Sequence, residues 1–110
     1  MSWEWDGVLT SNEQLVMLAI SRCGRQAYAR SIQEEIKEHG QAMTLGVLYT
    51  VLNRLERKQL IRHRDGDPTP ERGDRPKRLY VLTGVGAREL RGTLRVLDSL
   101  RGGAYAPQGA

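Results

Sequence analysis

Residues 44–61 read TLGVLYTVLNRLERKQLI, which predicts a two-faced helix followed by the start of a strand. Thr44 is a favourable N-cap residue. The apolar residues after it recur every three or four positions, the spacing of one helix face; they are Leu45, Leu48, Val51, Leu52 and Leu55. We expect a helix from Thr44 to Lys58 whose opposite, outward face carries Gly46, Tyr49, Thr50, Asn53 and Arg57.

Two further helices are expected before this one. Thr10 and Glu13 have the spacing of a capping box, which predicts a helix over about residues 12–22. A second helix is expected over about residues 28–39. A glycine follows each of them closely, as it often does at a helix end.

A hairpin and a last helix are expected after residue 60. Leu60 starts an extended segment, and residues 78–82 read RLYVL, a returning strand. Residues 65–77 between them hold three prolines and two glycines among charges, which predicts a long turn. Thr83 caps a helix to about Leu100. The predicted fold is mainly α with a small β-hairpin (α+β), in the order of a winged helix-turn-helix.

The length of 110 residues allows one domain with a small core. We expect an N-terminal arm over residues 1–10 and the winged helix-turn-helix over residues 11–100. That domain includes a dimerisation helix over residues 83–100, and a disordered tail is expected over residues 101–110.

Composition narrows the class of protein. The hydrophobic fraction of 39% and the charged fraction of 27% are typical of a globular chain rather than a disordered one. No apolar run is long enough to cross a bilayer, and the first residues do not have the pattern of a signal peptide. Cys23 is the single cysteine, which excludes an internal disulfide and fits a reducing cytoplasm. We expect a cytoplasmic protein.

The positive charge is concentrated in the middle of the chain. Residues 44–82 carry 9 basic and 5 acidic side chains, whereas residues 1–43 carry 4 basic and 6 acidic ones. A polyanion would therefore be attracted to the middle segment, although basic surfaces by themselves are weak evidence for nucleic acid.

The outward face of the helix from Thr44 suits double-stranded DNA, because the second helix of a helix-turn-helix enters the major groove. Thr44 and the first-turn amides would hold a phosphate, and Gly46 would let the backbone approach closely. Tyr49 and Thr50 would contact phosphate or a thymine methyl group, and Asn53 would pair with an adenine edge. Three basic residues further along are expected near the DNA backbone, Arg54, Arg57 and Lys58. Tyr49 has an alternative, which is packing against the preceding helix.

The hairpin is a second candidate for DNA contact. Its basic residues would cross the DNA backbone or enter the minor groove; they are Arg72, Arg75, Lys77 and Arg78. Four acidic residues lie among them, so the alternative is a solvated tip.

These segments resemble the PadR family of bacterial transcriptional regulators over about residues 9–100. Residues 44–61 are similar to the family's recognition-helix signature, and residues 79–83 with Gly86 and Leu90 resemble its junction between wing and last helix. Two positions depart from the family pattern. Thr50 stands where proline is common, and Gln59 stands where glycine is usual before the leucine-isoleucine pair; a left-handed conformation there would cost about 1 kcal/mol relative to glycine.

The resemblance implies a homodimer that binds a pseudopalindromic operator, often as a repressor relieved by a small molecule. The chain is similar to the short subgroup that lacks a large C-terminal domain, in which the first and last helices form the dimer. A broad leucine stripe on the last helix agrees with this. Residues 15–20 of the first helix are apolar on every side, so we expect that helix to be buried by its own domain on one face and by a partner chain on the other. The expected dimerisation residues are Leu15, Leu18, Leu90, Leu94, Leu97 and Leu100.

Trp3 and Trp5 alternate, so a strand-like arm would place both on one face. One interpretation is that they pack against a helix of the partner. The other is that they line a flat aromatic ligand site at the dimer centre, as tryptophans do in some short relatives.

An enzyme is not expected. Cys23, His39 and His63 are widely separated in the sequence and lack the paired spacing of a metal site. No phosphate-binding loop and no nucleophile elbow are found, so we expect no cofactor and no metal. Cys23 reads as a small core residue, with a redox sensor as the alternative. The alternative function for the whole chain is a winged-helix protein-interaction module, which would more often expose an apolar patch.

Overall fold

The computed structural model describes residues 7–66 and 77–102. Its element order is three helices, a hairpin and a fourth helix, which confirms the predicted α+β winged-helix class. The elements are α1 (Ser11–Cys23), the short 3-10 helix η1 (Gly24–Gln26), α2 (Ala29–Glu38), α3 (Leu45–Arg57), β1 (Ile61–Asp65), β2 (Arg78–Leu82) and α4 (Gly84–Arg101). Only η1 was not expected from the sequence.

Threonine side chains begin three of the helices as predicted. The Thr10 hydroxyl accepts the Glu13 amide at 3.1 Å, and the Glu13 carboxylate accepts the Thr10 amide at 2.9 Å, which completes a capping box on α1. Thr44 and Thr83 cap α3 and α4, each accepting the amide three residues on. These bonds satisfy amides that a helix leaves without a partner in its first turn.

The end of α3 turns sharply at Gln59, whose φ of 63° lies in the left-handed region. The Gln59 amide donates to the Glu56 carbonyl at 2.9 Å, and the Leu60 amide donates to the Leu55 carbonyl at 3.0 Å. This is the Schellman arrangement that usually employs glycine. A glutamine therefore occupies a conformation that disfavours a side chain.

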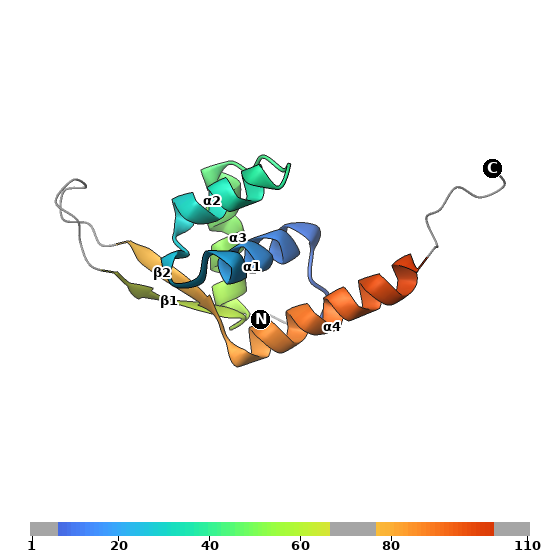
Figure 1. The fold of residues 1–110 in the computed structure, drawn as a ribbon. Helices are drawn as coiled ribbons and strands as arrows, with labels where there is room; N and C mark the ends of the chain where they lie inside the picture. The colour runs from blue at the N-terminus through green and yellow to red at the C-terminus, as the bar shows by residue number, and fades with distance from the viewer. Residues whose placement is uncertain (1–6, 67–76, 103–110) are drawn as a thin grey trace.

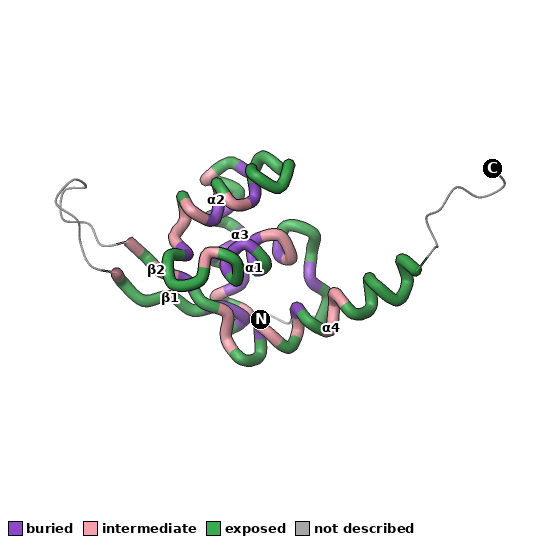
Figure 2. Tube along the Cα trace, in the orientation of Figure 1, coloured by how far each residue is buried: buried purple, intermediate pink, exposed green. Residues whose placement is uncertain are grey.

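The core lies where α1, α2 and α3 meet the hairpin. Figure 2 shows the buried positions gathered there, and every residue of the predicted α3 stripe except half-buried Leu45 is at most 2% exposed. In the hairpin, Ile61 pairs with Leu82 and Asp65 with Arg78. The Tyr80 amide also donates to the Ala27 carbonyl at 2.8 Å, which ties the segment after η1 to β2.

The last helix is anchored at its start and leaves the domain at its end. Gly86 is buried, and a Cβ there would stand 1.9 Å from the Leu60 carbonyl oxygen, so only glycine allows this approach. Leu90 is the last fully buried residue of α4. Beyond it the helix projects away from the other elements (Figure 1) and is exposed (Figure 2). Across the described residues, the helices are too short or too polar to cross a bilayer.

Candidate nucleic-acid interface

The outward face of α3 is polar and open, as the sequence predicts. All five residues of that face are exposed: Gly46, Tyr49, Thr50, Asn53 and Arg57. Tyr49 is 45% exposed, so the alternative of packing against α2 does not bury it. Val47 is also exposed, at 43%, and adds an apolar surface near the start of the helix that was not expected from the sequence.

Two small features shape the first half of this face. A Cβ on Gly46 would meet only the Thr44 hydroxyl, at 4.0 Å, so the surface beside Gly46 is flat and open rather than covered. The Thr50 hydroxyl donates to the Gly46 carbonyl at 3.0 Å. Its oxygen therefore faces an approaching molecule mainly as an acceptor, because its proton is engaged within the helix.

Arg54 does not belong to this open face. Its Nε donates to the Glu13 carboxylate of α1 at 3.0 Å, and Lys58 Nζ donates to the same carboxylate at 2.5 Å. Glu13 is fully buried, and the Lys58 side chain is 7% exposed. Arg54 and Lys58, both expected near DNA, are thus engaged in an internal ion pair, since a buried carboxylate requires partners. The sequence showed Glu13 only as a capping residue, because its partners lie 41 and 45 positions away.

This cluster changes the acidity of Glu13. Burial by itself raises the pKa, but hydrogen bonds from Lys58, from the Thr10 amide and from Arg54 lower it. The net result is a pKa below the ordinary value of 4.5. Glu13 is therefore ionised at neutral pH and connects the start of α1 to the second half of α3.

The turn between α2 and α3 is held by a side chain. Gln33 Nε2 on α2 donates to the Met43 carbonyl at 2.9 Å, just before the Thr44 cap. Ile32 and Ile36 bury the same helix in the core. These contacts fix the angle at which α3 leaves the turn, which is the geometry that a helix-turn-helix uses to present its second helix.

The base of the hairpin is fastened to α3 and α2. His63 Nδ1 lies 2.6 Å from the Glu56 carboxylate of α3, and its ring packs on that of Tyr80. The Lys77 ammonium lies 3.9 Å from the centre of the Tyr28 ring. Lys77, expected to contact DNA, is thus partly engaged with α2 through a cation–π contact. Arg78 is exposed, while Arg72 and Arg75 fall outside the described residues.

The expected dimerisation residues divide into two groups. Leu90 is 6% exposed and belongs to the chain's own core, and Leu15 and Leu94 pack against that core. The expectation that Leu90 faces a partner is therefore wrong, because α4 uses it to dock on its own domain. Leu18, Leu97 and Leu100 are 38%, 40% and 69% exposed. On α1, Leu18 is thus left open in the single chain. Trp3 and Trp5 lie outside the described residues.

Cys23 lies at the end of α1 and is half-buried. Burial raises the pKa of its thiol, so less of the reactive thiolate forms than at an exposed cysteine. Within residues 7–66 and 77–102, no three side chains of the kinds that bind metals come together.

A capped helix presenting a polar face, with a hairpin fastened beside it, defines the winged helix-turn-helix class of proteins. The model of the transcriptional regulator PadR-like family matches residues 17–92. This chain belongs to that family, as its resemblance over residues 44–61 indicated. The family is one of transcription regulators, not of enzymes.

Solved structures agree on the fold. The chain is similar to a PadR-like transcription factor from Bacteroides fragilis, with 28% identity, a TM-score of 0.70 and coverage of 84% of each chain. A PadR family transcriptional regulator from Eggerthella lenta DSM 2243 is 28% identical, with a TM-score of 0.67, over 83% of this chain and 78% of that one. A PadR family regulator from Clostridium difficile R20291, 22% identical, shares the fold with a TM-score of 0.71, over 84% of this chain and 92% of that one. No curated protein matches the chain.

Proposed function

We propose that this chain is a sequence-specific DNA-binding regulator that acts as a homodimeric repressor on a pseudopalindromic operator. The observation that carries the proposal is the exposed polar face of α3, which presents Tyr49 and Thr50 on one turn and Asn53 on the next. In this proposal the helix lies in the major groove, with Thr44 and Gly46 against the phosphate backbone and Asn53 on a base edge.

The basic residues that flank this face supply the attraction to phosphate. Arg57 and Arg78 are exposed and form no ion pair within the described part of the chain. Arg54 is left out of the proposed contacts, because it is held by Glu13. Lys77 stays in the proposal as a residue that steadies the hairpin on Tyr28 and adds charge beside the DNA.

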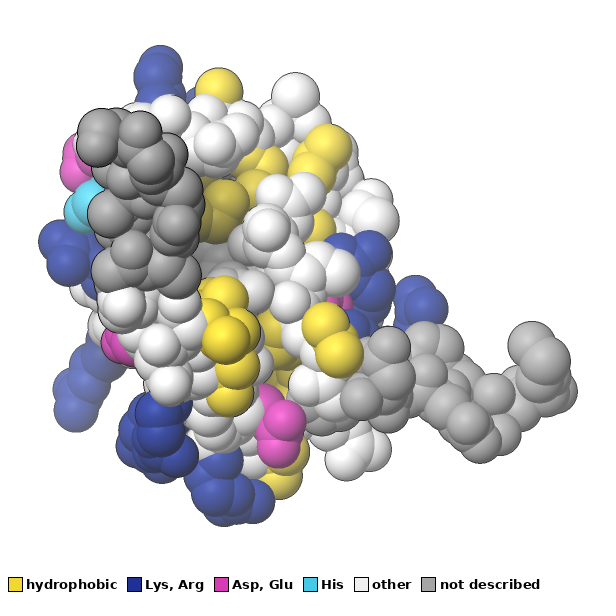
Figure 3. Space-filling model, turned by 90° about the vertical axis from the view of Figure 1, so that its right-hand side faces the viewer, with side chains coloured by type: hydrophobic (Ala, Val, Ile, Leu, Met, Phe, Trp, Pro, Cys, Tyr) yellow, Lys and Arg dark blue, Asp and Glu magenta, His cyan; other side chains and the backbone are white. Residues whose placement is uncertain are grey.

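The dimer part of the proposal rests on the outer half of α4. Val96, Leu97 and Leu100 are 57%, 40% and 69% exposed on a helix that projects from the domain. Figure 3 shows the molecule from the side toward which this helix projects. Hydrophobic side chains are visible in the middle of this view, and Lys and Arg side chains lie around them. A second copy that covers these leucines and Leu18 would remove them from water, at about 25 cal/mol per Å² of apolar surface.

The test is selection of genomic fragments with the purified full chain, followed by binding to the selected sequence at several salt concentrations. Recovery of one pseudopalindromic site, bound by two copies with a steep salt dependence, is the expected result. Binding without sequence preference, or no binding, would contradict the proposal and favour the protein-interaction module. A reporter behind the selected site should be expressed more strongly in cells that lack the protein.

The dimer is tested separately by Leu97→Glu, measured by light scattering. A charge within the proposed interface should convert the dimer to monomers while the helical circular dichroism is kept. Ser99→Glu is the matched control, since Ser99 lies on the same turn of α4, is exposed and is outside the apolar stripe. Dimers that persist in L97E would contradict this interface.

A further inference from the structure

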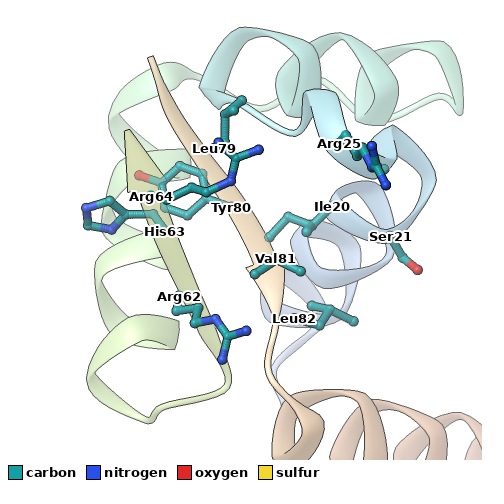
Figure 4. A pocket seen from close by; sticks show the side chains of 11 residues that line it. Ile20, Ser21, Arg25, Arg62, His63, Arg64, Leu79, Tyr80, Val81 and Leu82 are labelled. Atoms are coloured by element: carbon teal, nitrogen blue, oxygen red, sulfur yellow. The ribbon is translucent and has the colours of Figure 1, made fainter. Parts of the chain in front are cut away.

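A cleft lies between the hairpin and the end of α1, apart from the face of α3 described above. Its volume is about 580 Å³. Its walls come from the last turn of α1, from Gly24 and Arg25 of η1, and from both strands of the hairpin. Figure 4 shows Ile20, Val81 and Leu82 at the centre of this space, with arginine side chains around them.

Strand alternation places four of the hairpin residues that line the cleft on one face of the hairpin. Arg62 pairs with Val81 and Arg64 with Leu79, so these four side chains share a face. His63 and Tyr80 occupy the alternate positions, where His63 meets Glu56 of α3, and both residues also contribute to the lining of the cleft. Figure 4 likewise shows His63 on the opposite side of β1 from Val81. The two arginines of β1 that border the cleft thus lie with Val81 and Leu79 on the face opposite to the contact of His63 with α3.

Three arginines border the cleft: Arg25, Arg62 and Arg64. All three are exposed, and none forms an ion pair with a carboxylate in the described part of the chain. By contrast, Arg22, Arg54 and Arg101 each form an ion pair with an acidic side chain. The charge around the cleft is thus unbalanced, and guanidinium groups bind carboxylate or phosphate oxygens through paired hydrogen bonds.

The inner walls are apolar, in contrast to this border. Ile20, Leu79 and Leu82 are buried or half-buried there, and Val81 is 47% exposed to the open space. A volume of this size is in the range of small-molecule sites, which combine apolar walls with a few polar groups that orient the ligand. A ligand that matches both the arginine border and the apolar walls has an anionic group and an apolar body.

We propose that this cleft binds a small organic anion with an apolar body, such as a medium-chain carboxylate. The anionic group would lie between Arg62 and Arg64, and the apolar body would lie on Val81 and Ile20. None of the residues that line this site belongs to α3, the proposed DNA-binding helix. Binding is measured without DNA, so the proposal stands or fails independently of the proposed function.

Three probes separate the two parts of this recognition. Octanoate carries both charge and apolar body, 1-octanol carries only the body, and acetate carries only the charge. Backbone amide shifts in nuclear magnetic resonance titrations should change at Ser21, Arg62 and Val81 with octanoate. Octanol and acetate should bind at least about tenfold more weakly, a difference of about 1.4 kcal/mol for each part. Equal binding of octanoate and octanol, or shifts confined to other elements, would overturn the proposal.

Variants of the cleft supply the second test. Arg62→Ala with Arg64→Ala should weaken octanoate binding about tenfold or more, and Val81→Glu should do the same by placing a carboxylate on the apolar wall. Arg88→Ala is the control, an exposed arginine on α4 outside the cleft, and should bind octanoate as the unchanged protein does. If the Arg62 and Arg64 variant loses DNA affinity but keeps octanoate binding, the cleft belongs to the DNA interface and the proposal is wrong.

Discussion

The carboxylate of Glu13, on the first turn of α1, accepts a hydrogen bond of 3.0 Å from Nε of Arg54 on α3. Lys58, at the end of α3, contacts the same carboxylate at 2.5 Å. One buried acid thus joins the cap of the first helix to the helix that we propose reads DNA. The charge of Glu13 thus ties α1 to α3 through two cations of the same helix.

Glu13→Gln should lower the free energy of unfolding by about 3 kcal/mol, since removal of one member of a buried ion pair leaves its partners uncompensated. Urea unfolding followed by circular dichroism measures the change. Glu34→Gln on α2 is the matched control, because Glu34 is exposed and has no ion pair in the described part of the chain. A loss in E13Q no larger than that in E34Q would contradict a stabilising role for the cluster.

The same cluster should make stability depend on pH. The pKa of Glu13 in the folded protein lies below 4.5, its ordinary value, so the folded state binds the proton less readily than the unfolded state does. Its contribution is therefore complete above the ordinary pKa and is lost as the pH falls through the folded-state pKa. The difference in unfolding free energy between wild type and E13Q should be constant from about pH 6 to 7 and shrink below pH 4.5. A difference that grows in acid would contradict this sign.

Gln59→Gly should raise the free energy of unfolding by up to about 1 kcal/mol. Gln59 has a φ of 63°, where glycine is not strained, although glycine also increases the entropy of the unfolded chain. Thermal unfolding measures the effect. Gln41→Gly, at an exposed glutamine beyond the end of α2 whose φ is not positive, should give no gain. An equal effect of the two substitutions would show that Gln59 is not strained.

Gly86→Ala should destabilise the protein by about 2 kcal/mol or more, because the new methyl group would collide with the Leu60 carbonyl and push α4 away. Gly92→Ala on the same helix has nothing within 4 Å of its Cβ. It should stabilise the helix by about 0.5–1 kcal/mol. Calorimetric unfolding of the two variants separates the effect of the collision on stability from the effect of helix propensity. A G86A variant as stable as the unchanged protein would mean that α4 does not dock on Leu60.

Tyr49→Ala and Asn53→Ala should each weaken binding to the selected DNA by about 1–3 kcal/mol without changing the unfolding free energy by more than about 0.5 kcal/mol. Both side chains are exposed, so the fold does not depend on them. Fluorescence anisotropy with labelled DNA measures affinity. The control is Lys37→Ala, an exposed basic residue of the last turn of α2. Unchanged affinity in both variants would remove α3 from the proposed interface.

Local signals made much of the fold predictable. Thr10, Thr44 and Thr83 each cap a helix where the sequence places the cap, because a hydroxyl one turn before an amide is sufficient to form that bond. The three- and four-residue spacing of apolar residues in α3 likewise identified its inner face. The outward residues of the candidate interface followed from the same periodicity.

The errors concern contacts between distant segments. Arg54 was expected on the DNA side, but Glu13 is brought beside it by the packing of α1 on α3. Leu90 was expected at the dimer surface, but it is 6% exposed and lies in the core of its own domain. The cleft was not anticipated, because the end of α1 and the strands of the hairpin form its walls only after folding.

The sequence by itself determined the helices, their caps, the outward face of α3 and the family, since each depends on residues within a few positions or on an ordered set of motifs. Only the tertiary structure decided which charges are internal and which leucines remain exposed. Those outcomes depend on the direction in which packed helices and strands leave the core, because a side chain's partner is set by its neighbours in space. Glu13 and Arg54 are 41 positions apart in the chain and 3.0 Å apart in the fold.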